Sequence, residues 1–231
     1  MNRKLERNIS ISKAVRKVLY NHPCILDSIK MEIVNYSALA SKIKGEVERI
    51  IGRRNIRPEA IKMALIRFSE KLRRDEKNLE NKIRSIMERS ILELKGDISI
   101  MTVRQERITY KLDRIMGIAD KSRFFQLTQG TKTFTLIFDR TMTEEMVEEI
   151  GCENILSHIK NQSAIIIKSP SQVLNTPGFM AYITSQLARN GINITQMVSC
   201  YEDTILIVDR SEAGRAFKIL EEDILGIRSE V

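Results

Sequence analysis

Hydrophobic residues in the last third of the chain follow first a strand pattern and then a helix pattern. Residues 163–168 form a short β-branched apolar run, and the turn-forming residues that follow predict the end of a strand. Phe179, Ile183 and Leu187 recur every four residues, so we predict a helix from Phe179 to the Asn-Gly pair at 190–191.

Two more strands and a second helix are predicted after this point. Residues 195–200 and 204–208 have strand patterns on either side of a polar turn at 201–203, and residues 211–222 carry an apolar helical face. The last third of the chain therefore has the predicted element order βαββα.

The residues of this region resemble a known family. Asn-Thr-Pro-Gly-Phe at 175–179, Asn-Gly-Ile-Asn-Ile at 190–194 and Thr-Ile-Leu-Ile-Val-Asp at 204–209, followed by Ser-Glu-Ala-Gly-Arg-Ala, resemble the ACT domain, most closely the aspartokinase type. The resemblance covers residues 163–222. It implies a ferredoxin-like βαββαβ fold that binds an amino acid or similar ligand between paired domains and passes the signal to an attached module.

A site for a zwitterion is expected where the predicted helix begins. A helix N-terminus offers unpaired N–H groups to a carboxylate, and a glycine lets the backbone approach a ligand closely. The resemblance adds an asparagine at the start of the next strand. The candidate ligand-binding residues are Asn175, Thr176, Pro177, Gly178, Phe179, Asn193 and Ile194. The alternative is that these loop residues only terminate elements and that Asn193 caps a turn.

The middle of the chain is predicted to repeat this unit in degenerate form. Its pattern indicates, in order, a strand, a helix, two strands and a helix at 97–103, 108–118, 124–128, 133–139 and 143–150. We therefore expect a first ACT-like unit at 96–160 and a second at 161–231. Residues 104–107 replace the Pro-Gly loop of the second copy, which favours a role as pairing partner over a ligand site.

Charge is distributed unevenly along the chain. The first 96 residues carry 23 Lys and Arg against 12 Asp and Glu, a net charge of +11, whereas the remaining 135 residues carry 15 against 18, a net charge of −3. Such asymmetry favours an acidic partner such as nucleic acid. Solvated basic helices are the alternative explanation.

Several short helices are predicted in this basic part. Apolar periodicity indicates helices at 10–20, 24–33 and 36–50, with Asn35 as a cap, and a further helix that starts at Pro58 and runs to about residues 67–71. A basic turn at 52–55 precedes the last of them. This arrangement at 1–71 resembles a helix-turn-helix or winged-helix module, whose final helix enters the DNA major groove.

The resemblance to such modules implies a set of nucleic-acid contacts. The candidates are Arg53, Arg54, Arg57 and Lys62, whereas Ile61, Leu65 and Phe68 are expected in the core. One Phe and two Tyr up to residue 95 disfavour an aromatic stacking platform for RNA. The alternative is a helical domain that docks on a protein or dimerises.

Two interpretations of residues 72–95 remain open. Leu72, Leu79 and Ile86 are seven residues apart, which is typical of a dimerising helix or of an amphipathic spacer. Alternatively, residues 91–94 pair with 98–103 as a hairpin that serves as a wing.

Little in the sequence supports catalysis. Cys24, Cys152 and Cys200 are widely separated in apolar contexts, so we expect reduced core thiols in a cytoplasmic protein. His22 and His158 lack the spacing of a metal or nucleophile site. No catalytic residues, metal, cofactor or membrane span are expected.

The combined interpretation is an α+β protein with an N-terminal all-helical, winged-helix or helix-turn-helix-like domain and two ferredoxin-like ACT units. We expect a cytoplasmic regulator that binds a small-molecule effector, contacts double-stranded DNA and forms a homodimer or higher homo-oligomer through its ACT-like units. The alternative is a regulatory subunit that docks on a metabolic enzyme through its helical domain.

Overall fold

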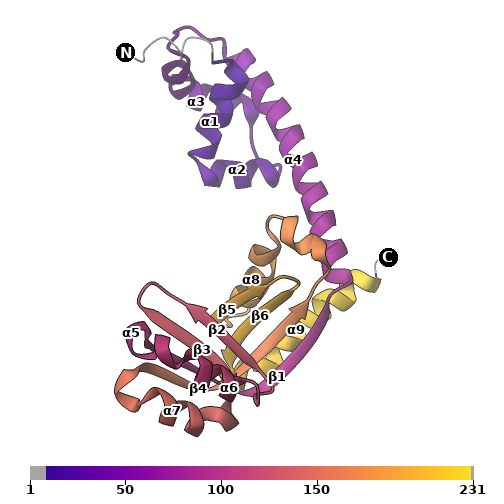
Figure 1. The fold of residues 1–231 in the computed structure, drawn as a ribbon. Helices are drawn as coiled ribbons and strands as arrows, with labels where there is room; N and C mark the ends of the chain where they lie inside the picture. Colours follow the sequence, from indigo (N-terminus) through magenta and orange to yellow (C-terminus); the bar gives the residue numbers. More distant parts are fainter. Residues whose placement is uncertain (1–8, 230–231) are drawn as a thin grey trace. The chain divides into compact units, whose positions relative to one another are not determined.

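The computed structural model describes residues 9–229, which divide into a helical unit up to Asn81 and a sheet unit from Lys82 onwards (Figure 1). The helical unit contains α1 (Ile11–Tyr20), α2 (Pro23–Lys30), α3 (Tyr36–Ile51) and most of α4 (Pro58–Glu88). Its core draws on all four helices, with Val15 and Leu19, Ile29, Ile43 and Val47, and Ile61 and Leu65 at its centre.

Local signals fix where these helices begin. The Asn35 side chain accepts hydrogen bonds from the N–H groups of Ser37 and Ala38, which confirms it as the cap of α3. Pro58 begins α4, as predicted. The predicted core residues Ile61 and Leu65 are fully buried, and Phe68 packs against them.

Helix α4 is much longer than predicted. It continues to Glu88 instead of ending near residue 71, so residues 72–88 are helical as expected but belong to the same helix. The alternative hairpin of residues 91–94 with 98–103 is not formed, because residues 91–104 make one uninterrupted strand. The packing of the helices does not by itself establish a helix-turn-helix motif.

The sheet unit contains one antiparallel sheet with the strand order β2-β3-β1-β4-β6-β5. Its strands are β1 (Ile91–Arg104), β2 (Phe125–Gln129), β3 (Thr133–Asp139), β4 (Ile155–Lys168), β5 (Ile194–Cys200) and β6 (Asp203–Asp209). Its helices are α5 (Gln105–Ile108), α6 (Leu112–Ala119), α7 (Thr143–Ile150), α8 (Phe179–Arg189) and α9 (Arg210–Ser229), and its short 3-10 segments are η1 (Thr109–Lys111), η2 (Arg140–Met142), η3 (Cys152–Asn154) and η4 (Ser171–Asn175).

The two central strands serve both halves of the sheet. The second part of β1 pairs with β3, and the second part of β4 pairs with β6. Along their whole length the two strands also pair with each other, from Ile91 opposite Lys168 to Val103 opposite Ile155. The boundary expected at 160/161 therefore falls inside β4.

Each central strand is bent by a bulge. The register shifts between Lys95 and Ile98 and again between Ile98 and Ile100, and Asp97 and Asn161 take left-handed backbone angles with φ of 58° and 56°. Asp and Asn tolerate this region better than other residues with a Cβ, and a bulge bends and twists its strand.

The bent sheet folds back on itself. Cys200 of β5 donates a hydrogen bond from Sγ to Oε1 of Gln126 in β2 over 3.5 Å, although these strands form opposite edges of the sheet. A flat six-stranded sheet would separate its edges by roughly 24 Å. Ile98, Ile137 and Ile205 belong to the apolar core that fills the space between the two halves.

Helices cover the outer faces of the two halves (Figure 1). Ile115 of α6 and Met146 of α7 pack with Leu136 and Phe138 of β3. Phe179, Ile183 and Leu187 of α8 are buried as the sequence pattern predicts, and α9 packs on β1, β4 and β6. No helix among the described residues has the length and apolar character that a bilayer crossing requires.

The prediction for the cysteine side chains is wrong. The cysteines are not core thiols, because all three side chains are exposed: Cys24 lies in the first turn of α2, Cys152 in η3, and Cys200 at the end of an edge strand. His158 lies in β4, and burial lowers its pKa.

Asp139 and Asp209 end equivalent strands and allow a matched comparison. Asp139 Oδ1 accepts hydrogen bonds from N and Oγ1 of Thr141, and Asp209 Oδ1 accepts the same pair from Ser211. Only Asp139 is buried, with a side chain that is 3% exposed and also accepts a bond from Arg123.

We predict that Asp139→Ala lowers the free energy of unfolding by about 1–3 kcal/mol in urea titrations, because the three hydrogen bonds that the buried carboxylate accepts are lost. The hydrogen bond from Arg123 lowers the pKa of Asp139, so this contribution is present above the unfolded Asp pKa of about 3.9 and disappears as the pH falls through the lowered folded value. Asp209→Ala is the control with the smaller expected loss. Equal losses of unfolding free energy in Asp139→Ala and Asp209→Ala at neutral pH would contradict the larger stabilising role given to Asp139.

Candidate functional site

The loop between β4 and α8 contains most of the residues predicted to bind a ligand. Its backbone is held by a hydrogen bond from Val173 N to Pro170 O and by Thr176 Oγ1, which donates to Gln172 O over 2.8 Å. Gly178 precedes α8 with a left-handed φ of 85°, a conformation in which glycine carries no steric cost. No side chain caps this helix start.

The side chains of this loop differ in their solvent exposure. Asn175 and Pro177 are exposed and Thr176 is half-buried. Phe179 is 1% exposed and lies in the core with α8, so only its backbone N–H is available to a ligand.

A cavity of about 330 Å³ adjoins the loop within the sheet unit. Gln172, Asn175 and Thr176 line one side. The rest of the lining comes from Lys82, Ser85 and Ile86 in the last turns of α4 and from Arg89, which directly follows the helix.

The α4 wall of the cavity is basic. Arg89 is oriented by hydrogen bonds from Nε to Ser85 O and from Nη2 to Ser85 Oγ, over 2.9 and 3.4 Å. Lys82 forms no ion pair with any residue that the structure describes. The arrangement offers two cationic groups, an amide and a hydroxyl to one small polar ligand.

Asn193 and Ile194 lie away from this loop. They follow the C-terminal end of α8, whereas Gly178 precedes its N-terminal end, and the helix has 11 residues, a length of about 16 Å. The strand register also separates them. Ile194 pairs with Val208 near the end of β6, whereas the loop follows Lys168, which pairs with Asp203 at the start of β6. One chain therefore does not bring the two predicted parts of the site together.

The turn between β5 and β6 lies beside the loop instead. Ser169 N donates to Glu202 O over 2.9 Å, and Ser169 Oγ lies 3.0 Å from Ser90 Oγ in a buried pair. This proximity follows from the antiparallel pairing of β4 with β6, because the end of β4 then lies beside the start of β6. Nothing in the local pattern predicts the contribution of Lys82 and Arg89, because they precede the loop by more than 80 residues.

The predicted nucleic-acid contacts occupy the connection between α3 and α4. Gly52 ends α3 with a φ of 73°, and the connection is fixed by Ile56 N, which donates to Glu48 Oε1 over 3.0 Å. The side chains of Arg53, Arg54 and Arg57 are exposed, and that of Lys62 is half-buried. None of these four cations has an acidic partner within the described part of the chain.

Groups of side chains suited to a metal were not found among residues 9–229. Two carboxylates of α7 have structural partners, because Glu145 in its first turn pairs with Lys121 and Glu149 near its end pairs with Arg114.

Comparisons with known proteins identify part of the chain. A family model described as ACT domain matches residues 157–222. No curated protein matches the chain.

Several solved structures match part of the chain. The regulatory subunit of aspartate kinase from Thermus thermophilus is 14% identical, with a TM-score of 0.47 over 57% of this chain and 95% of that one. The aspartokinase alpha and beta subunits are 16% identical, with a TM-score of 0.47 over 58% and 97%. Aspartate kinase from Clostridium acetobutylicum is 15% identical, with a TM-score of 0.48 over 58% of this chain, which spans 34% of that enzyme.

The family assignment rests on the family model, whose limits enclose the second part of β4, the loop, α8, β5, β6 and most of α9. Residues 157–222 of this protein therefore belong to the ACT domain family.

Proposed function

We propose that this protein is a cytoplasmic ligand-responsive regulator, in which the ACT domain binds an amino acid or related metabolite and the basic helical unit binds double-stranded DNA. The observation that carries the proposal is the continuity of α4. The helix begins at Pro58, next to the unpaired basic residues, and its last turns line the cavity at the ACT loop. A ligand in the cavity would contact the helix that also belongs to the basic unit.

The chemistry of the cavity supports an amino acid as ligand. Lys82 and Arg89 suit a carboxylate, and the start of α8 adds a partial positive charge. The side-chain oxygens of Asn175 and Thr176 are acceptors for an ammonium group. A volume of about 330 Å³ lies at the small end of the range for ligand sites.

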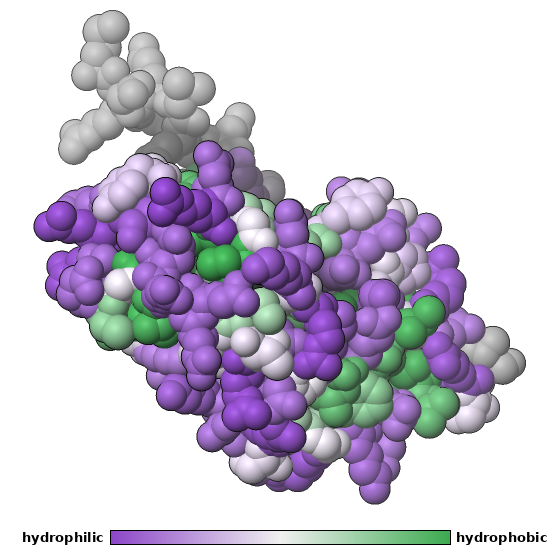
Figure 2. All heavy atoms as spheres, turned by 60° about the horizontal axis from the view of Figure 1, so that its bottom comes forward, coloured by the Kyte–Doolittle hydropathy of each residue, from purple (hydrophilic) through white to green (hydrophobic). Residues whose placement is uncertain are grey.

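A second copy would complete the site predicted from the sequence. Asn193 and Ile194 are too far from the loop to contact the same small ligand within one chain, so they would serve the loop of a partner ACT domain. β5 is an edge strand of the sheet and would be the element that meets the partner. Figure 2 shows a face on which hydrophilic residues predominate and several groups of hydrophobic residues are exposed. Met197 of β5 is 45% exposed.

The proposed DNA contacts are electrostatic. Arg53, Arg54 and Arg57 are exposed without acidic partners in the described chain, which suits contacts to phosphate groups. Lys62 follows one turn into α4. Regulation requires that the ligand prefer one pairing of the ACT domains over another, since equal affinity for both shifts nothing.

Docking on a metabolic enzyme is the second candidate. It is favoured by large apolar side chains that the helical unit exposes, namely Met31 and Ile33, each 69% exposed, and Met63, 51% exposed. Exposed apolar residues of this kind are typical of protein contacts.

We predict that one of the twenty common amino acids raises the melting temperature of the full-length protein in a thermal-shift screen. At a concentration of 100 times Kd, bound ligand adds about 2.7 kcal/mol to the free energy of unfolding. Lys82→Gln should weaken binding about tenfold by removing a charge-assisted hydrogen bond. Lys77→Gln is the matched control, because Lys77 is exposed on the same helix and outside the cavity. Equal binding by both variants would contradict the site.

We predict salt-sensitive binding to fragments of sheared genomic DNA at two salt concentrations. Arg53→Glu combined with Arg54→Glu should reduce the affinity and lower the log-log salt slope by about 1.8 if both side chains contact phosphates.

The control for this experiment is Arg114→Glu combined with Arg215→Glu, which changes the net charge equally in the sheet unit. Loss of DNA binding in the control as well would indicate a general charge effect. No binding by the wild-type protein at low salt would exclude the DNA proposal and favour docking on an enzyme.

A further inference from the structure

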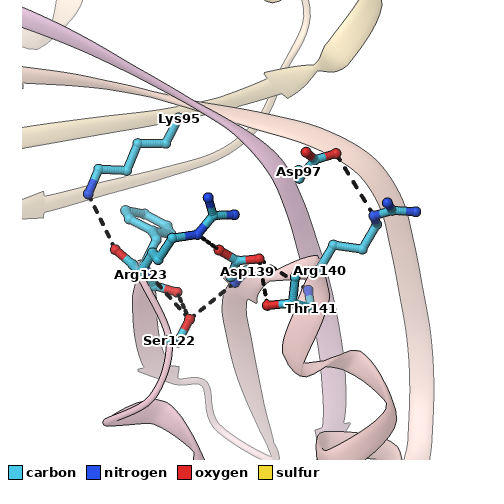
Figure 3. Close-up of polar contacts among 8 residues, drawn as sticks. Lys95, Asp97, Ser122, Arg123, Asp139, Arg140 and Thr141 are labelled. Carbon is cyan, nitrogen blue, oxygen red and sulfur yellow. Dashed lines mark hydrogen bonds and ion pairs between the residues drawn. The ribbon is translucent and has the colours of Figure 1, made fainter.

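A second cavity of the sheet unit, of about 320 Å³, lies at the bulge in β1. It is lined by Leu94, Lys95, Gly96 and Ile98 of β1, by Arg123 and Phe124 before β2, and by Asp139 at the end of β3. Figure 3 shows Lys95, Arg123 and Asp139 converging from these three segments. The loop at 175–179 takes no part in it.

Arg123 is held in place by its inner nitrogen. Its Nε donates to Asp139 Oδ2 over 2.5 Å, and the Asp139 side chain is 3% exposed while that of Arg123 is 72% exposed. The buried carboxylate therefore orients the guanidinium and leaves its two terminal nitrogens available. A guanidinium fork of this kind matches the two oxygens of a carboxylate.

Lys95 supplies a second cation to the same cavity. Its Nζ donates to Arg123 O over 3.3 Å and lies 5.8 Å from the centre of the Phe124 ring. Lys95 forms no ion pair within residues 9–229, and the nearby Glu93 is occupied by Lys168. With one carboxylate and two cations, the lining carries a net charge of +1.

The acidic groups near the cavity are already paired with cations, and the Asp139 side chain is only 3% exposed. Asp139 Oδ1 accepts two hydrogen bonds from Thr141, and its Oδ2 accepts the bond from Arg123. Asp97 is paired with Arg210 and, over 3.9 Å, with Arg140. An ammonium group would therefore meet cations without an acceptor carboxylate, which disfavours amino acids.

The remaining lining is apolar. Phe124 and Ile98 are 7% and 1% exposed, and Leu94 is 44% exposed. A Cβ on Gly96 would meet no atom within 4 Å, so space remains open above the strand. A ligand for this cavity combines an anionic head with an aliphatic tail.

We infer that this cavity binds a small aliphatic monocarboxylate, with its carboxylate on Arg123 and Lys95 and its tail against Phe124 and Leu94. The site is separate from the amino-acid site proposed at the ACT loop. It connects β1, which the two halves of the sheet share, to the end of β3 in the first half.

Calorimetric titration of the full-length protein with isocaproate tests the inference. Two ligands of matched shape accompany it: leucine adds only an α-ammonium group, and isocaproamide replaces the carboxylate with a neutral amide. We expect binding of isocaproate, and at least about tenfold weaker binding of both other compounds at this cavity.

Two variants locate the binding. Arg123→Gln removes the guanidinium and should weaken isocaproate binding about tenfold or more, and Gly96→Val should abolish it by filling the open space. Arg114→Gln is the control, because it removes another exposed arginine paired with a carboxylate in the same unit. Thermal unfolding of each variant verifies the fold.

Three results would overturn the inference. The first is the absence of isocaproate binding by the wild-type protein at millimolar concentration. The second is unchanged affinity in Arg123→Gln and Gly96→Val with the fold intact. The third is equal binding of isocaproamide at the site that Gly96→Val blocks, which would show that the anionic head is not recognised.

Discussion

The pairing of β1 with β4 is the interaction on which the rest of the sheet unit depends. Each strand gives one part to the first half of the sheet and the other part to the second half, so neither half has all its strands alone. Bulges at Asp97 and Asn161 bend both strands and allow the halves to face each other across a shared apolar core. Because the halves share strands, we expect them to unfold together, and a ligand bound to one affects the stability of both.

The same constraint positions both proposed sites. The end of β4 places the loop at 169–178 against the last turns of α4, and the bulge in β1 opens the space beside Arg123. The two sites differ in chemistry because one offers an amide and a hydroxyl beside its cations, whereas the carboxylate of the other is buried and already paired with Arg123. One fold thus offers one site suited to a zwitterion and another suited to a simple anion.

Periodicity predicted the elements whose stability is local. These elements could be predicted because each depends on residues within one or two turns. They are the strand at 133–139, the helix at 143–150, the start of α8, the cap at Asn35 and the first residue of α4, Pro58. The missed segments are residues 91–96 and 155–162. The first pairs with residues 164–168 and the second with residues 98–103, in each case more than 50 positions away along the chain. The cavity residues Lys82 and Arg89 were missed for the same reason, and helix length and strand direction separate Asn193 from Gly178.

The central claim is that a ligand at the ACT loop acts on the basic unit through α4. Hydrogen–deuterium exchange of the full-length protein, with and without the amino acid that stabilises it, tests this most directly. The account predicts slower exchange at residues 82–89 and 171–178 together with altered exchange in the first turns of α4, near Pro58. Changes confined to the sheet unit, with α4 unaffected before Asn81, would contradict it.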